Sequence, residues 1–394
     1  MDAGDGSIQD PRHEPGRQSD RQGGGAGQVE RQRTVGEKGI LALLGLRRDL
    51  IGLDVDARSV RMVQLRRRNG DYTVVGASTT DVEPWAGDQS QHRANTVRAI
   101  REGFGALEPG GNLAVCGLKG PEVVVRGFEF PGMPKDEVES AVGLEASQAC
   151  PFSCEGVTLA HQVTSGSDRR ALGYWAAATE RLIEDRRQLA YEAGLHCALM
   201  DVDGLALLNC LDGLSAATSS GKGHGGIADG DRSRAAILHM GDSYTTIAIV
   251  DQAGRPFVRD VSSSGQEVVR QVSQEAGLSE DAALAALNGG PGSSAIPTGC
   301  LERGCSHLLD DVVTTLRYYT AKNPLAKVNQ VLVCGRFALV PSIIDLLGAK
   351  LPYQVTVWNP VADLRCEASP RCEELLRTVG PAMAIATGLA LRRI

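Results

Sequence analysis

The chain has 394 residues, of which 42% are hydrophobic, and its formal net charge at pH 7 is -7. This length allows two or three packed lobes, because single hydrophobic cores stop growing well below it. The acidic balance argues against a general nucleic-acid-binding protein, which would carry a basic face.

The ten cysteines predict neither a disulfide framework nor a metal site. They are scattered, no CxxC pair occurs, and no histidine stands at ligand spacing beside them. We therefore expect reduced thiols in a cytosolic protein. The apolar stretch from Ile40 to Leu46 is far shorter than the ~20 residues of a membrane span. Residues 1–38 have no apolar core of the kind that a signal peptide needs.

Residues 1–38 contain no leucine and no aromatic residue, and their charges nearly cancel. Such a segment buries too little apolar surface to offset its ordering entropy, which predicts a disordered tail. The next stretch, GILALLGLRRD, is expected to pack as a lid on the first strand. Alternatively, it forms a surface helix that contacts lipid or a partner.

After Leu50, strand-like and helical patterns alternate. Strands are expected within 51–65 and at 71–78, 113–118, 123–130, 157–163 and 171–179, and a helix at 92–107. Pro134 and the acidic pair Asp136 and Glu137 indicate the start of a second helix. An amphipathic helix from 180 should end at Gly194.

Residues 214–232 are rich in Gly and Ser, which predicts a linker. They contain Gly221-Lys222, but the GxxxxGK[ST] spacing of a phosphate-binding loop is absent. Beyond the linker we expect a strand pair at 234–261, helices at 265–278, 279–287 and 301–322, a strand at 330–335, a helix from Pro341 and a final helix at 380–393.

A strand–turn–strand pattern occurs twice, in LIGLDVDARSVRMVQL from Leu50 and in LHMGDSYTTIAIV from Leu238. Asp54 aligns with His239, and Asp56 aligns with Gly241. Two similar lobes that each present a hairpin turn to a shared cleft would suit a nucleotide, whose phosphates would face the backbone N–H groups of both turns.

These two turns resemble the two phosphate loops of the actin, Hsp70 and FtsA-like ATPases. More narrowly, the chain from about Gly39 to the C-terminus resembles the PilM family of type IV pilus assembly. The most specific stretch is VVRGFEFPGMPKDEVESAVGLEASQACPF, and GLHCALMDVDGLALLN, SSSGQEVVRQV and VLVCGRFALVPSI follow in the family's order.

The resemblance implies an α/β fold: an actin-like (ribonuclease H-like) two-lobe ATPase fold with a duplicated core and an inserted small α+β lobe, called 1C. It places lobe 1A at 39–118 and 197–213, lobe 1C at 119–196, the linker at 214–232 and lobe 2A/2B at 233–394.

Three positions depart from the family's nucleotide-binding pattern. Asp56 stands where the family has Gly, and its charge would oppose a phosphate by about 4 kcal/mol at ~4 Å and an effective dielectric of ~20. His239 replaces an Asp that helps to hold Mg²⁺ or water, and a neutral imidazole is a poor Mg²⁺ ligand. The family's two adjacent glycines are reduced to Gly335, which is followed by the bulky Arg336 and Phe337.

We therefore expect a degenerate cleft, with no catalytic residue and no metal site assigned, and with ATP and Mg²⁺ as cofactors only if the cleft is functional. The candidate cleft residues are Asp54, Arg58, Ser59, Gly241, Ser243, Gly265 and Gly335. Alternatively, Arg58 or Arg336 neutralises Asp56 or holds a phosphate. Asp203 stands where the family carries an acidic residue near the cleft, but it is interpreted as a helix N-cap. Asp54 suits either a turn-stabilising role or a metal–water ligand.

The resemblance also implies a groove, between lobe 1C and the adjoining lobe, for the N-terminal cytoplasmic peptide of a PilN-like inner-membrane protein. The candidate groove residues are Arg126, Phe128, Pro131, Met133, Pro134, Glu145, Pro151 and Phe152. Rigid prolines and apolar side chains suit an extended peptide, and Arg126 suits an acidic group on it. Alternatively, Phe128 and Phe152 fill the core of the lobe.

The function expected from this resemblance is a cytoplasmic scaffold of a type IV pilus, or of a related secretion or competence machine. It would be peripheral at the inner membrane through its partners, with no nucleic acid bound. The alternative is an active ATPase whose nucleotide state controls docking. A sugar kinase of the same superfamily lacks a visible substrate signature, and an L-type protein of type II secretion would carry a membrane helix.

Overall fold

The computed structural model describes residues 49–393 except 69, 86, 108–109, 154, 168–169, 217–234, 252–253, 291–295 and 324–327. The predicted tail, the GILALLGLRRD lid except for Asp49, and most of the predicted linker lie outside the described residues. Within the described part of the chain, no helix is both long and apolar enough to cross a bilayer.

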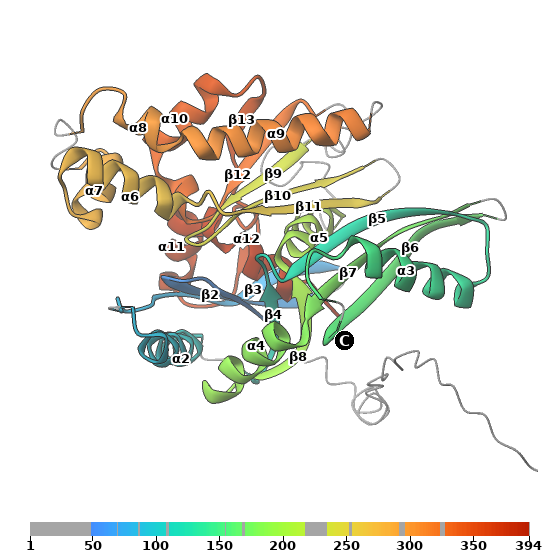
Figure 1. Ribbon diagram of the computed structural model, residues 1–394. Coiled ribbons are helices and arrows are strands. Elements are labelled where there is room, and N and C mark those ends of the chain that lie inside the picture. Colours follow the sequence, from blue (N-terminus) through green and yellow to red (C-terminus); the bar gives the residue numbers. More distant parts are fainter. Residues whose placement is uncertain are drawn as a thin grey trace, which may run out of the picture. The chain divides into compact units, whose positions relative to one another are not determined.

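The first sheet has six strands in the order β14-β3-β2-β1-β4-β8 (Figure 1). They are β1 (Ile51–Val55), β2 (Ser59–Arg68), β3 (Asp71–Asp81), β4 (Leu113–Leu118), β8 (His196–Val202) and β14 (Arg365–Cys366). Strands β1 and β2 are antiparallel, with Asp54 opposite Arg61. Residues 56–58 form the first hairpin turn between them.

The second sheet has the order β11-β10-β9-β12-β13. Its strands are β9 (Ala235–Met240), β10 (Thr245–Val250), β11 (Pro256–Val261), β12 (Gln330–Cys334) and β13 (Gln354–Val357). Met240 lies opposite Thr245, so residues 241–244 form the second hairpin turn. The strand–turn–strand repeat predicted from the sequence is therefore present in both sheets.

Two helices, α5 (Asp203–Ala216) and α12 (Ala384–Ala390), lie between the two sheets and share one hydrophobic core with them. Helix α12 packs closely on β1 and on α5 because glycines, which have no side chain, stand at the contacts. A Cβ atom at Gly52 of β1 would lie 1.8 Å from the Ala386 carbonyl oxygen, and one at Gly388 would lie 1.9 Å from that of Ala206. Both glycines are therefore required for this layer.

The outer faces of the two sheets are covered by separate sets of helices. The first sheet is covered by α2 (Gln89–Ala106) and α4 (Glu180–Glu192). The second is covered by α6 (Gly265–Ala276), α7 (Glu280–Leu287), α8 (Cys300–Gly304), α9 (Ser306–Lys322) and α10 (Pro341–Lys350). The remaining helices are α11 (Pro370–Val379) and the short 3₁₀ turns η4 (Arg336–Leu339) and η5 (Gly380–Met383).

A third sheet, in the order β5-β7-β6, packs against these layers through Val125 of β5, which lies in one buried cluster with Val202 and Leu205. Its strands are β5 (Val123–Pro131), β6 (Val157–Ser167) and β7 (Arg170–Thr179), and α3 (Lys135–Ala149) packs on it. The helix follows Pro134, as predicted, with Asp136 and Glu137 in its first turn. Helix α4 ends before Gly194, whose φ of 92° only glycine adopts readily.

The predicted lobe boundaries differ from the packing at two places. Helix α4 buries Leu189 and Ala190 in the core of the first sheet, so the third sheet and its helix span only 123–179. Strand β14 pairs with β3, and α12 packs on β1, although both were expected in the second lobe. Strand pairing decides which layer a segment joins, and it links segments that are far apart in the sequence.

Candidate functional site

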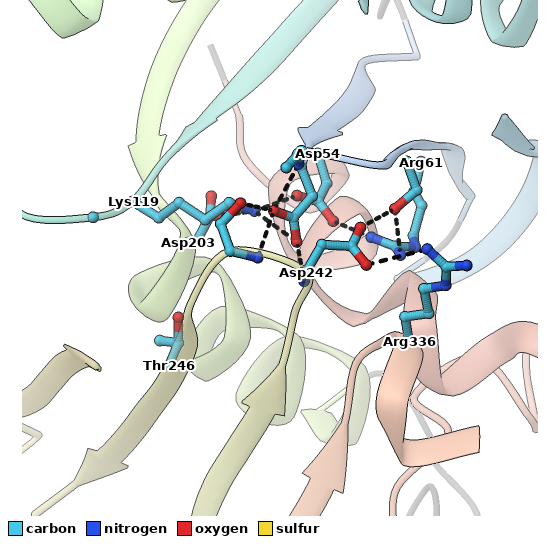
Figure 2. Close-up of polar contacts among 12 residues, drawn as sticks. Asp54, Arg61, Lys119, Asp203, Asp242, Thr246 and Arg336 are labelled. Carbon is cyan, nitrogen blue, oxygen red and sulfur yellow. Dashed lines mark hydrogen bonds and ion pairs between the residues drawn. The ribbon is translucent and has the colours of Figure 1, made fainter. Parts of the chain in front are cut away.

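Buried charges gather where the first and second hairpin turns meet (Figure 2). The exposed fractions are 0% for Asp54, 3% for Asp56, 2% for Arg61, 8% for Lys119, 1% for Asp203 and 4% for Asp242. A buried charge without a partner destabilises a fold by several kcal/mol, so these groups must neutralise one another.

Lys119, directly after β4, is the central cation of this cluster. Its Nζ lies 3.1 Å from Asp54 Oδ1, 3.2 Å from Asp203 Oδ2 and 3.8 Å from Asp56 Oδ2. Burial acts to lower the pKa of Lys119, but the three carboxylates raise it above its ordinary value, so the amine stays charged. The ammonium group therefore supplies positive charge at a point where acids converge from three segments.

Arg61 is the second buried cation, and it links the first turn to the second. Its Nη1 donates to Asp54 Oδ2 at 3.3 Å, and its Nη2 donates to Ser59 Oγ at 2.7 Å. Ser59 Oγ in turn donates to Asp242 Oδ2 at 2.8 Å. Burial acts to raise the pKa of Asp54, but Lys119 and Arg61 hold it below its ordinary value. Asp54 is thus a paired structural carboxylate in this arrangement.

The Asp56 carboxylate accepts hydrogen bonds from the backbone N–H groups of the second turn. It accepts hydrogen bonds from the N–H of Asp242 at 2.8 Å and of Ser243 at 3.3 Å, and from Ser243 Oγ at 2.8 Å. Burial disfavours its charged form, but Lys119 and Arg61 hold the pKa of Asp56 well below its ordinary value. Successive N–H groups in a turn form an anion-binding concavity. Here the anion is a side chain of the same protein.

Gly241 permits this approach of the two turns. A Cβ atom at position 241 would lie 2.7 Å from Asp56 Oδ2 and 2.9 Å from the Tyr244 carbonyl oxygen. Any other residue would therefore push the Asp56 carboxylate away from the second turn.

The segment after β12 closes the opposite side of the second turn. Arg336 Nη1 lies 3.2 Å from Asp242 Oδ1. The Phe337 ring is fully buried, and a Cβ atom at Gly265 would lie 2.0 Å from it. Gly335 has a φ of 92°. The predicted cleft residues Gly265 and Gly335 both lie against the segment 240–241, and an aromatic ring occupies the space against Gly265.

Two more contacts join the halves of the chain. Arg58 Nη2 donates to Glu280 Oε2 at 2.8 Å, a half-exposed pair that contributes little to stability. Asp260 of β11 accepts from the Gly120 N–H at 2.8 Å. The alternative that Arg58 or Arg336 neutralises Asp56 is wrong, because Arg58 pairs with Glu280 and Arg336 pairs with Asp242. Lys119 and Arg61 supply the positive charge near Asp56.

Asp203 and His239 also lie in the cluster. The expectation that Asp203 caps α5 is wrong: its Oδ2 pairs with Lys119, and its buried Oδ1 has no hydrogen-bond partner. Burial raises the pKa of Asp203 to about 8. Burial lowers the pKa of His239 to about 4, so its imidazole is neutral at pH 7. Among the residues that the structure describes, no group of three or more His, Cys, Asp or Glu is arranged to hold a metal ion.

The sequence reasoning missed Lys119 and Asp242. Both left a weak signal: Lys119 ends the apolar run LAVCGL, and Asp242 follows the glycine of the second turn. A charged residue at the end of a buried strand often lies at a functional edge of a sheet.

The predicted groove residues lie on or beside the third sheet, and they differ in exposure. Phe128 is 2% exposed, stacks on Phe130 with ring centroids 4.7 Å apart, and packs on Trp175, so it is a core residue, as the alternative held. Arg126, Pro131, Pro134 and Pro151 are exposed, whereas Met133, Glu145 and Phe152 are half-buried.

Two sheets with matching strand–turn–strand units, whose turns meet over a buried charge cluster, define an actin-like α/β protein. A solved PilM-PilN type IV pilus biogenesis complex matches with a TM-score of 0.71 and 20% identity, covering 88% of this chain and 99% of that chain. Ethanolamine utilization protein EutJ from Carboxydothermus hydrogenoformans matches with a TM-score of 0.48 and 11% identity, covering 87% and 89%.

The family model for type IV pilus assembly protein PilM matches residues 52–394. The chain therefore belongs to the PilM family, and the predicted family and actin-like fold are confirmed.

Proposed function

We propose that this chain is a cytoplasmic actin-like scaffold of type IV pilus assembly that docks the N-terminal peptide of a PilN-like inner-membrane protein without needing a nucleotide. Membership of the PilM family and the fold shared with the PilM of a PilM-PilN complex support the partner. The observation that most strongly supports a nucleotide-free cleft is the Asp56 carboxylate on the N–H groups of the second turn.

Asp56 and Lys119 together act as a built-in ligand. The carboxylate takes the place of an anion at the second turn, and the ammonium takes the place of a cation among the acids. A hydrogen bond to a charged group contributes about 1.5–3 kcal/mol. Displacing the three bonds from Asp242 and Ser243 would therefore oppose a phosphate by at least roughly 4.5 kcal/mol, which is a factor of about 10³ or more in affinity.

The partner peptide would bind at the third sheet. Arg126 on β5 and the prolines at 131, 134 and 151 present exposed side chains beside α3. Prolines restrict the surface to few conformations, so less entropy is lost when an extended peptide binds. Docking there would hold the scaffold at the inner membrane through its partner alone.

One observation favours a second candidate, an ATPase whose nucleotide state controls docking. Asp203 lies buried beside the turns with one unpartnered oxygen, and Gly241 and Gly335 keep the close backbone approaches that a nucleotide cleft needs. In that case Asp56 would swing away when Mg-ATP binds.

Calorimetric titration of the full chain with the partner's N-terminal peptide tests the proposal. We expect Arg126→Glu to weaken binding at least tenfold, whereas Arg371→Glu, an exposed change on α11, should leave it unchanged. Millimolar Mg-ATP should leave the melting temperature of the unbound chain unchanged. A clear upward shift with Mg-ATP would favour the ATPase, and equal losses in both variants would reject the proposed groove.

A further inference from the structure

A cavity of about 540 Å³ lies beside the two hairpin turns. Its wall is built from the first turn, helices α2 and α4, the segment 119–122 after β4, and Ser243 and Tyr244 of the second turn. Sites for small molecules in proteins occupy ~300–1,000 Å³. The cavity is thus large enough for a ligand, and it touches both halves of the chain.

The charged side chains on the wall are almost all paired within the protein. Arg93 donates to Asp185 at 2.6 Å, and Glu122 accepts from Thr179 Oγ1 at 2.6 Å. Asp56 and Lys119 belong to the buried cluster already described. These groups need no ligand to neutralise them.

Arg186 of α4 is the exception among the charged wall residues. It makes no hydrogen bond or ion pair with any residue that the structure describes, and its Nε is buried without a partner. Arg186 also acts to lower the pKa of Lys119, so the two cations repel each other across the wall. A charged guanidinium group without an acceptor in the protein is stabilised when an anion pairs with it.

The remaining wall is partly apolar, with Val55, Pro121, Leu182 and Leu189. A matching ligand therefore carries one negative group on an apolar body, because only one wall charge is unpaired. A polyanion such as a triphosphate would instead face the carboxylates of Asp56, Glu122 and Asp185.

We propose that this cavity binds a small organic anion whose single carboxylate or phosphate pairs with Arg186 and whose apolar body lies against Leu182 and Leu189. Because Asp56 and Ser243 line the same cavity, the bound molecule contacts both turns and stabilises the contact between them. None of the candidate groove residues lines this cavity, and the proposed ligand is not a nucleotide, so the site goes beyond the proposed function.

The test uses 1-anilinonaphthalene-8-sulfonate, an apolar fluorophore with one anionic group, titrated into the full chain. We expect saturable binding that Arg186→Gln weakens at least tenfold. The matched control is Arg187→Gln on the same helix, whose side chain is 57% exposed and pairs with Glu184. It should bind as the parent chain does. Circular dichroism melts establish that each variant is folded.

Two further measurements keep the proposal testable. Leu182→Trp, which fills the apolar part of the cavity and keeps the Arg186 residue, should also weaken binding if Arg186→Gln does not fold. Benzoate and phenyl phosphate should displace the fluorophore, and the stronger competitor identifies a carboxylate or a phosphate ligand. Parent-like affinity in Arg186→Gln, an equal loss in Arg187→Gln, or no displacement by either competitor would overturn the proposal. None of these results depends on partner docking or on ATP.

Discussion

Replacing Asp56 by alanine should weaken the contact between the two hairpin turns and lower the free energy of unfolding. The change removes the acceptor for the Asp242 and Ser243 N–H groups and for Ser243 Oγ. Removing one member of a buried ion pair destabilises a protein by about 3–5 kcal/mol. Lys119 keeps Asp54 and Asp203 as partners, so we expect the lower end, about 3 kcal/mol. Total stabilities of domains are about 5–15 kcal/mol, so such a loss is readily measured.

Urea denaturation followed by circular dichroism measures this loss as a change in midpoint at constant slope. Asp71→Ala, an exposed change at the end of the β2–β3 hairpin, is the control and should lie within about 0.5 kcal/mol of the parent. Asp56→Asn should be intermediate, because its amide oxygen still accepts from the second turn.

Inorganic phosphate provides a second readout, since it should bind the N–H groups that Asp56→Ala exposes. At 10 mM phosphate and a dissociation constant of about 1 mM, the variant should gain about 1.4 kcal/mol, and the parent chain should gain nothing. A loss below 1 kcal/mol in Asp56→Ala, or equal stabilisation of both chains by phosphate, would refute the reasoning.

Three further predictions concern the surrounding residues. Burial lowers the pKa of His239 to about 4. As the pH falls, the unfolded chain binds a proton at this imidazole near pH 6.5 while the folded chain does not, so the free energy of unfolding falls between pH 6.5 and 4. His239→Gln should reduce this fall by about 3 kcal/mol, as measured by urea denaturation at several pH values between 6.5 and 4. A fall as large as that of the parent chain would contradict the prediction. Phe337→Ala should lose about 3–5 kcal/mol and open space against Gly265, so that adenosine raises the melting temperature of the variant alone. Gly388→Ala should lower the melting temperature by at least several degrees, because its Cβ would lie 1.9 Å from the Ala206 carbonyl oxygen, and a parent-like melt would contradict the packing.

The strand–turn–strand repeat and several helix ends were predictable because they depend on local chemistry. Alternating apolar residues specify β1 and β9, Pro134 precedes α3, and Gly194 follows α4 with a positive φ. The actin-like fold followed from the order of such motifs rather than from any one of them.

The centre of the site was less predictable, because it depends on topology. Strand β4 lies between β1 and β8, and this order brings Lys119 between Asp54 and Asp203. No local pattern reveals that order. The sequence indicated that Asp56 opposes a phosphate, but its bonds to the second turn arise only when the two sheets pack together.

The most direct test of the account is the affinity of the PilN-like N-terminal peptide for the full chain, measured after apyrase treatment and again with millimolar Mg-ATP. If Asp56 and Lys119 fill the cleft, the two dissociation constants should agree within error. A tenfold or larger difference between them would contradict a scaffold that docks without nucleotide.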